Sequence, residues 1–126
     1  MEEDVSYREA ERFVALALRH QGWMIEATNY RGPGFEIDLV ACKAQTRLFI
    51  EVKLRGQIQT PNSELWHELL SPRKRAALLR GARQLLASGF LRPGPMHSRF
   101  DLALVSKQGS DFKIHYQTDV LREFVE

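Results

Sequence analysis

The sequence has a single cysteine, no long apolar run, and no acidic residue between positions 71 and 99. The lone cysteine, Cys42, excludes an intrachain disulfide and favours a reducing compartment. Without an apolar run of about 18 residues, no membrane-spanning helix is expected. The N-terminal Met1-Glu2-Glu3-Asp4 is acidic and is not followed by the apolar core of a secretory signal. These absences predict a soluble, cytoplasmic protein.

The 126 residues suffice for one globular domain, 1–126, with an ordinary hydrophobic core, and are too few for two. Hydrophobic residues make up 44% and charged residues 27%, which is typical of a soluble protein. The formal net charge is only +2, but the charges are segregated. Residues 1–11 hold five acids, and residues 71–99 hold seven bases. This segregation predicts a basic surface, although a merely solvated helix face would explain it equally well.

Hydrophobic periodicity and capping residues divide the chain into two helices and five strands. The first helix is expected to begin at a capping box formed by Ser6 and Glu9, and to end near Gly22. The second is expected to begin at Ser71-Pro72 and to end near Ser88-Gly89. Strands are expected at 23–30, 35–41, 47–54, 100–105 and 112–116, with a long loop at 55–70. This order, αβββαββ, favours a mixed α/β fold with an antiparallel hairpin.

The second and third predicted strands form the hairpin, and both alternate apolar with charged residues. If the turn is centred on Ala44-Gln45, Asp38 lies opposite Glu51, and Glu36 lies opposite Lys53. The apolar residues then share the other face: Ile37, Leu39, Ile50 and Val52. A slip of one residue would mix apolar with charged residues on both faces, so the pattern itself favours this register.

The predicted register places two carboxylates, those of Asp38 and Glu51, directly opposite each other. Like charges in this position destabilise a sheet unless a cation lies between them. Converging carboxylate oxygens are the ligands that Mg²⁺ prefers, and Mg²⁺ can polarise a phosphoryl oxygen and activate water. Lys53, on the same face, would orient that water or neutralise developing charge. The alternative is a solvent-facing hairpin with a Glu36–Lys53 salt bridge and no metal.

The spacing from Asp38 to Glu51-Val52-Lys53 resembles the core motif of the PD-(D/E)XK nuclease superfamily. Residues 29–31, 36–40 and 49–55 resemble more narrowly the YraN-like family of uncharacterised bacterial proteins, and Lys74 and Arg99-Phe100-Asp101 fit the later part of its signature. The likeness covers residues 7–106. It implies a restriction-endonuclease-like fold, a central mixed sheet flanked by helices. Archaeal Holliday-junction resolvases are similar in their spacing of acid, acid and lysine.

The resemblance also implies roles for individual residues. Asp38, Glu51 and the Val52 carbonyl would be metal ligands, and Lys53 would be the catalytic lysine. Glu11 would assist, as a glutamate of the first helix does in resolvase-like members. Glu11 lies on the flank of the apolar stripe and can point toward the sheet, although an exposed helix charge is the alternative.

Three positions depart from the pattern of the resembled families. Ile37 precedes Asp38 where the superfamily has proline, which is usual for the YraN-like group. Tyr7 stands where that group often has glycine, and Phe35 where it has a small or polar residue. None of the three changes removes a predicted catalytic group.

The second predicted helix carries Arg73, Arg80 and Arg83 on the side opposite its apolar stripe. Exposed guanidinium groups in a row suit contacts with the phosphates of a nucleic acid. Lys74 is grouped with these arginines as a nucleic-acid contact, because it matches a basic position of the resembled family.

The leading hypothesis is therefore an endonuclease that needs Mg²⁺ or Mn²⁺ and hydrolyses phosphodiester bonds of DNA, including branched or junction DNA. A second hypothesis is a catalytically inactive nucleic-acid-binding protein or scaffold in DNA processing. A third, a protein-interaction domain, leaves the acid-free segment 71–99 unexplained. Resolvase-like enzymes act as dimers because two strands need two sites, so a homodimer accompanies the first hypothesis, although no segment marks a dimer surface.

Overall fold

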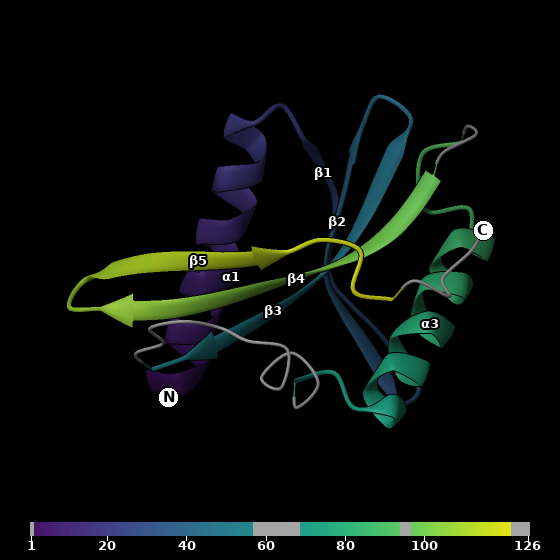
Figure 1. Ribbon diagram of the computed structural model, residues 1–126. Coiled ribbons are helices and arrows are strands. Elements are labelled where there is room, and N and C mark those ends of the chain that lie inside the picture. The colour runs from purple at the N-terminus through teal and green to yellow at the C-terminus, as the bar shows by residue number, and fades with distance from the viewer. Residues whose placement is uncertain (1, 57–68, 94–96, 122–126) are drawn as a thin grey trace.

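The computed structural model describes residues 2–56, 69–93 and 97–121, without the side chains of residues 2–5. In these ranges the chain forms the following helices and strands (Figure 1): α1 (Glu2–His20), β1 (Met24–Gly32), β2 (Phe35–Lys43), β3 (Thr46–Arg55), α3 (Pro72–Ala87), β4 (His97–Gln108) and β5 (Asp111–Gln117). Within the described residues, the helices and strands follow the expected order. Most of the expected loop at 55–70 lies outside the described residues.

The five strands form one sheet in the order β1-β2-β3-β4-β5. Neighbouring strands are antiparallel, except that β3 and β4 run parallel. A parallel pair needs a long crossover, and α3 lies within the connection from β3 to β4. The two helices pack against opposite faces of the sheet (Figure 1). The central strands are therefore buried on both faces.

Helix α1 begins earlier than expected, at Glu2, so the capping box formed by Ser6 and Glu9 is wrong. At the other end, Gly22 adopts a φ of 93°, and the Trp23 N–H donates to the Leu18 carbonyl at 3.0 Å. The predicted termination at Gly22 is confirmed.

Helix α3 begins as its sequence predicts. The Ser71 side chain accepts a hydrogen bond from the Lys74 N–H at 3.2 Å, and Pro72 occupies the first turn. The helix ends at Ala87, where the Ser88 N–H donates to the Leu85 carbonyl. In the part of the chain that the structure describes, no helix is long and apolar enough to cross a membrane.

The predicted register of the β2–β3 hairpin is confirmed along its ladder. Leu39 pairs with Ile50 and Lys43 with Thr46, which leaves Ala44-Gln45 as the turn. Ala44 adopts a φ of 53°, in a region where a residue with a Cβ atom is disfavoured.

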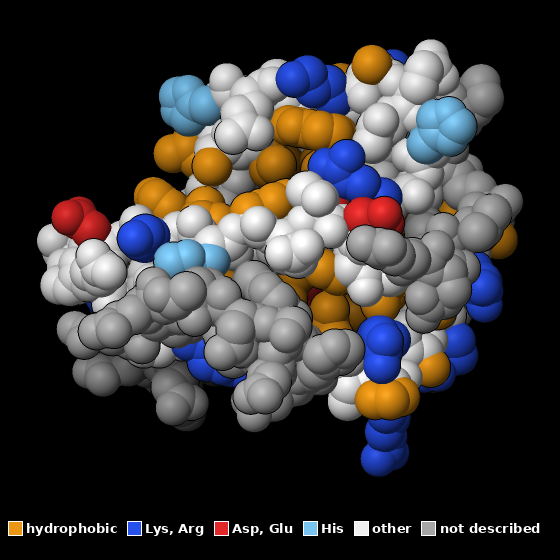
Figure 2. Space-filling view, viewed as in Figure 1, with side chains coloured by type: hydrophobic (Ala, Val, Ile, Leu, Met, Phe, Trp, Pro, Cys, Tyr) orange, Lys and Arg blue, Asp and Glu red, His pale blue; other side chains and the backbone are white. Residues whose placement is uncertain are grey.

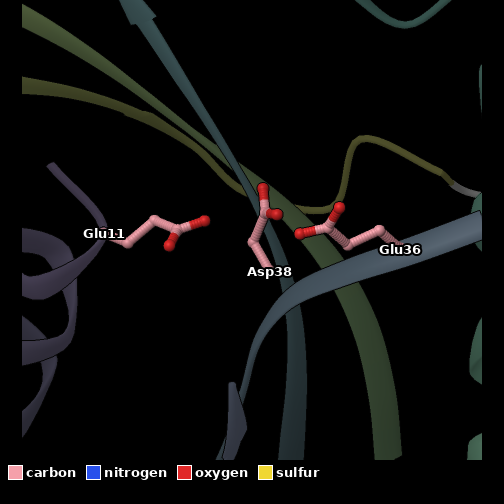
Figure 3. Close-up of side chains that lie close together, drawn as sticks. All are labelled: Glu11, Glu36 and Asp38. Carbon is pink, nitrogen blue, oxygen red and sulfur yellow. The ribbon is translucent and has the colours of Figure 1, made fainter. Parts of the chain in front are cut away.

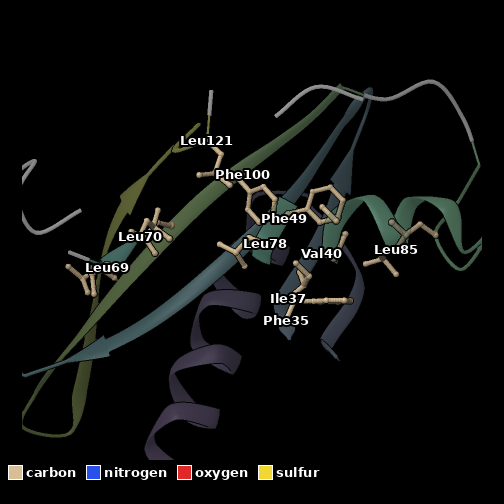
Figure 4. Close-up of a cluster of buried hydrophobic side chains, with 14 residues drawn as sticks. Phe35, Ile37, Val40, Phe49, Leu69, Leu70, Leu78, Leu85, Phe100 and Leu121 are labelled. Carbon is tan, nitrogen blue, oxygen red and sulfur yellow. The ribbon is translucent and has the colours of Figure 1, made fainter. Parts of the chain in front are cut away.

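Two hydrophobic clusters, one on each face of the sheet, form the core. The cluster beneath α3 contains Phe35, Ile37, Val40, Phe49, Leu78 and Leu85 among others (Figure 4). Leu39, Ile50 and Val52 belong to the cluster beneath α1. The expectation that Ile37 shares their face is wrong, because the alternation of faces along β2 breaks between Ile37 and Leu39. The break lies across from Asn29, whose φ of 48° interrupts the regular twist of β1.

Candidate metal centre

Strands β2 and β3 separate beyond the Leu39–Ile50 pair, and the predicted acids lie at this point. The Val52 N–H, which would otherwise continue the ladder, donates to Asp38 Oδ2 at 2.8 Å. The Asp38 side chain thus takes the place of a backbone partner of β3. Asp38 and Glu51 face each other at this point, but they do not form an ordinary ladder pair. Their side chains are buried, with relative exposures of 4% and 3%. The alternative of a solvent-facing hairpin is contradicted.

Burial and the neighbouring Glu51 carboxylate raise the pKa of Asp38 to about 9. The charged form is disfavoured because water cannot solvate it, and because Glu51 repels a second negative charge. In the absence of a metal ion, Asp38 is thus protonated at neutral pH. A cation between the two carboxylates would replace that proton.

Two ammonium groups contact the same oxygen of Glu51. Lys53 Nζ and Lys74 Nζ each lie 3.1 Å from Glu51 Oε2. The other oxygen, Oε1, is buried and has no hydrogen-bond partner among the residues that the structure describes. A buried oxygen without a partner is costly in a native fold, and a cation bound at this carboxylate would compensate that cost.

Glu11 reaches the same site from helix α1 (Figure 3). Its side chain is buried, and both carboxylate oxygens accept hydrogen bonds from Asn29 Nδ2, at 3.2 and 3.1 Å. Burial raises the pKa of the Glu11 carboxyl. The alternative of an exposed helix charge is contradicted. The left-handed backbone of Asn29 helps to turn its amide toward Glu11.

Glu36 completes a group of three carboxylates. Figure 3 shows the carboxylates of Glu11, Glu36 and Asp38 directed toward one another. One oxygen from each lies within 4.8 Å of the others. Glu36 also pairs with Arg31, at 3.3 Å from Oε1 to Nε, and accepts from Asn29 at 3.3 Å. The alternative hypothesis expected a salt bridge between Glu36 and Lys53. Lys53 pairs with Glu51 instead.

The described donors fit a hard divalent cation. Opposite oxygens around Mg²⁺ lie about 4 Å apart, so the three carboxylates need to approach one another only slightly. Glu51 lines the same cleft and adds a fourth carboxylate to it. An all-oxygen, negatively charged donor set suits Mg²⁺ or Mn²⁺ better than soft metals.

The carbonyl of Val52, the third metal ligand implied by the resemblance, already has a partner. The Tyr7 hydroxyl of α1 donates a hydrogen bond to it. Burial, and then the neighbouring carboxyl groups of Asp38 and Glu51, raise the pKa of the Tyr7 hydroxyl, so Tyr7 stays a donor at neutral pH. The departure at Tyr7 therefore lies inside the site.

These side chains line an open cleft of about 880 Å³. Its lining contains four acids and four bases, with Tyr7 and Asn29 between them: Glu11, Glu36, Asp38, Glu51, Arg8, Arg31, Lys53 and Lys74. The cleft can thus hold a cation near its acids and an anion near its bases. This pairing is what binding of a metal ion together with a phosphate requires.

The arginines of α3 lie apart from the carboxylates. Arg73, Arg80 and Arg83 are exposed, and Arg80 Nη2 donates to the Gly34 carbonyl at 3.3 Å. Figure 2 shows Lys and Arg side chains gathered over the part of the molecule where Figure 1 places α3. The prediction that these three arginines lie on the side opposite the buried apolar stripe of α3 is confirmed. Lys74, which the sequence grouped with them, reaches into the cleft instead.

The Arg99-Phe100-Asp101 segment also lies elsewhere. Asp101 is fully buried and accepts hydrogen bonds from Arg99, from the Tyr116 hydroxyl at 2.6 Å and from the Asp119 N–H at 2.9 Å. Arg99 lines a second cavity, of about 420 Å³, against α1 and β5. The arrangement joins β4 to β5 and to the segment that follows, so its role is structural.

Sequence reasoning missed the contributions of Tyr7, Asn29 and Glu36 to the site. Asn29 and Glu36 carried a usable signal, because both belong to segments of the resemblance, and asparagine also tolerates positive φ. Nothing in periodicity shows that the Tyr7 hydroxyl reaches a carbonyl 45 residues away.

Comparison with known proteins identifies the family. A profile of the Uncharacterised protein family UPF0102 matches residues 10–105. A UPF0102 protein of Desulforapulum autotrophicum is 34% identical over 117 residues, which cover 89% of this chain and 93% of that protein. A UPF0102 protein of Synechococcus sp. is 37% identical over 109 residues, or 84% of this chain and 77% of the relative. The chain belongs to this family, in agreement with the resemblance to an uncharacterised YraN-like group.

Proposed function

We propose that this protein is a divalent-metal-dependent DNA endonuclease of the PD-(D/E)XK superfamily, with a restriction-endonuclease-like fold. The proposal includes branched or junction DNA among its substrates. The observation that carries it is the group of carboxylates from Glu11, Glu36 and Asp38, whose oxygens lie within 4.8 Å of one another in a cleft that Glu51 also lines. A fold tolerates such a group of acids when a cation compensates them.

In this proposal, Asp38 and Glu51 would hold the metal ion. The Val52 carbonyl, which now accepts a hydrogen bond from the Tyr7 hydroxyl, would be a further ligand. Glu11 lies close enough to Asp38 to hold the ion or a water molecule beside it. When bound, Mg²⁺ or Mn²⁺ supplies a Lewis acid for a phosphoryl oxygen and lowers the pKa of a water molecule.

The basic groups of the cleft and of α3 would bind the substrate. Lys53 is already directed into the cleft by Glu51, and its ammonium stabilises negative charge that develops on the scissile phosphate. Arg73, Arg80 and Arg83 contact phosphates further along the DNA, which orients the strand without reading its sequence.

The proposal is tested by cleavage of linear, single-stranded, flapped and four-way DNA in the presence of Mg²⁺, Mn²⁺ or chelator. Glu51→Ala is expected to lose both cleavage and metal binding. Lys53→Ala is expected to lose cleavage by about 10²-fold or more, by analogy with other preorganised charged groups, while DNA binding persists. Any activity that persists in Glu51→Ala protein from the same preparation belongs to a contaminant.

A second candidate function, binding of nucleic acid without cleavage, is favoured by the hydrogen bond from Tyr7 to the Val52 carbonyl. In that case the acids are a relic site and the basic face of α3 provides the function. The two candidates differ in a simple outcome. Wild-type protein that binds DNA but cuts no form of it with either metal supports the second, provided that Lys53→Ala behaves identically.

A further inference from the structure

Lys74 differs from the arginines of its own helix in what it contacts. Its ammonium lies 3.1 Å from Glu51 Oε2, and its side chain, 35% exposed, lines the cleft. Arg80, in contrast, contacts the Gly34 carbonyl at the β1–β2 turn. Lys74 thus faces the carboxylates, whereas Arg73, Arg80 and Arg83 are exposed.

The start of α3 holds Lys74 in this position. Its own N–H donates to Ser71 Oγ, which caps the helix, and Leu78 one turn further is fully buried against the sheet. The helix cannot rotate without exposing Leu78, so the Lys74 side chain remains directed at Glu51. Its long stem still lets the ammonium move between nearby acceptors.

We infer that Lys74 is a phosphate-binding residue of the cleft, held on Glu51 until a metal ion takes that carboxylate. The inference rests on the proposed function. It removes Lys74 from the row of nucleic-acid contacts on the outer face of α3 and assigns it to the phosphate nearest the metal.

The electrostatics of Glu51 carry this step. One carboxylate oxygen is shared by the ammonium groups of Lys53 and Lys74, and both lie at ion-pair distance. If the same carboxylate held a divalent ion, both ammonium groups would be repelled, and the negative charge that holds them would be compensated. The more exposed ammonium, that of Lys74, is released more readily. A phosphate oxygen beside the metal is then its strongest available partner.

Two consequences follow. In the metal-free protein, Lys74 competes with the metal for Glu51, so its removal tightens Mg²⁺ binding. In the metal-loaded protein, Lys74 adds a contact to the DNA, so Mg²⁺ strengthens DNA binding through it, and by linkage DNA strengthens Mg²⁺ binding.

The experiment measures Mg²⁺ affinity by calorimetry for wild type, Lys74→Gln and the charge-matched control Lys113→Gln, which alters an exposed lysine of β5. Lys74→Gln is expected to bind Mg²⁺ about twofold to fivefold more tightly than either of the others, as the loss of a partly exposed ion pair predicts. Lys74→Arg, which keeps the charge, is expected to remain close to wild type. Thermal melts without metal show that each variant is folded.

The second measurement is the affinity for a linear duplex with phosphorothioate linkages, which resist cleavage, with and without Mg²⁺. Wild type and Lys113→Gln should bind this DNA more tightly when Mg²⁺ is added. For Lys74→Gln this gain in DNA affinity should be about tenfold smaller, which is the value of a charged hydrogen bond. If wild type binds Mg²⁺ but Lys74→Gln matches the control in both measurements, this inference alone is overturned. If wild type binds no Mg²⁺, the proposed function fails as well.

Discussion

Replacement of Asp38 by asparagine tests the buried carboxyl directly. In the folded protein the pKa of Asp38 is about 9, against an ordinary value of 3.8 that applies when the chain is unfolded. Between these values the folded state holds a proton that the unfolded state has released. Stability from this group is therefore fully present below pH 3.8 and is lost as the pH rises toward 9.

The size of the effect at pH 7 follows from this difference. Each pH unit above the pKa of the unfolded chain adds about 1.36 kcal/mol to the cost of taking up the proton on folding. At pH 7 this cost is at most about 4 kcal/mol. Asparagine avoids this cost, and its side-chain oxygen can still accept the hydrogen bond from the Val52 N–H. Asp38→Asn is expected to raise the free energy of unfolding by about 2–4 kcal/mol at pH 7, and by little at pH 4.

The assay is urea unfolding of metal-free wild type and Asp38→Asn at several pH values between 4 and 8. An equal difference at every pH, or a less stable variant at pH 7, would refute the reasoning. Addition of Mg²⁺ provides the second half of the test. Wild type should gain stability and release close to one proton per ion near pH 7, whereas Asp38→Asn should show neither effect.

Three further predictions concern the β2–β3 turn, the Val52 carbonyl and the exposed arginines of α3. Ala44→Gly should stabilise the fold by about 0.5–1 kcal/mol in thermal melts, because glycine adopts the positive φ of this turn without strain; a loss of stability would contradict the turn geometry. Tyr7→Phe should destabilise the metal-free fold by about 1 kcal/mol through loss of its hydrogen bond to Val52, and the loss should shrink in Mg²⁺ if the ion takes over the carbonyl. Replacing both Arg80 and Arg83 by alanine should weaken binding to DNA of any sequence and lower the salt dependence by roughly one unit of slope per lost contact, as fluorescence anisotropy at several salt concentrations would show; an unchanged slope means that this face is merely solvated.

Local patterns predicted much of the fold because their physical causes are local. The cap at Ser71 depends on a side chain and an N–H three residues apart, and the structure has this hydrogen bond. The prediction failed at Ser6, where an equally good cap lies within a longer helix. A capping motif says where a helix can begin, and it does not exclude that favourable residues before it continue the helix.

The candidate site was predictable in part. The register that opposes Asp38 and Glu51 follows from alternation, since a slip of one residue would reverse every side chain of the strand. Alternation assumed one polar and one apolar face, however, and thus missed that the strands are buried on both sides. Burial changes Asp38 from an exposed charge into a protonated acid.

The sequence by itself therefore determined the hairpin, its register and the two facing carboxylates, because these depend on residue types at short, regular spacing. Only the tertiary structure decided which groups surround them. Helix α1 brings Glu11 and the Tyr7 hydroxyl to one side of the cleft, and α3 brings Lys74 to the other. Such contacts depend on how helices pack across a sheet, which is set by the whole core and is not encoded in the periodicity of any one segment.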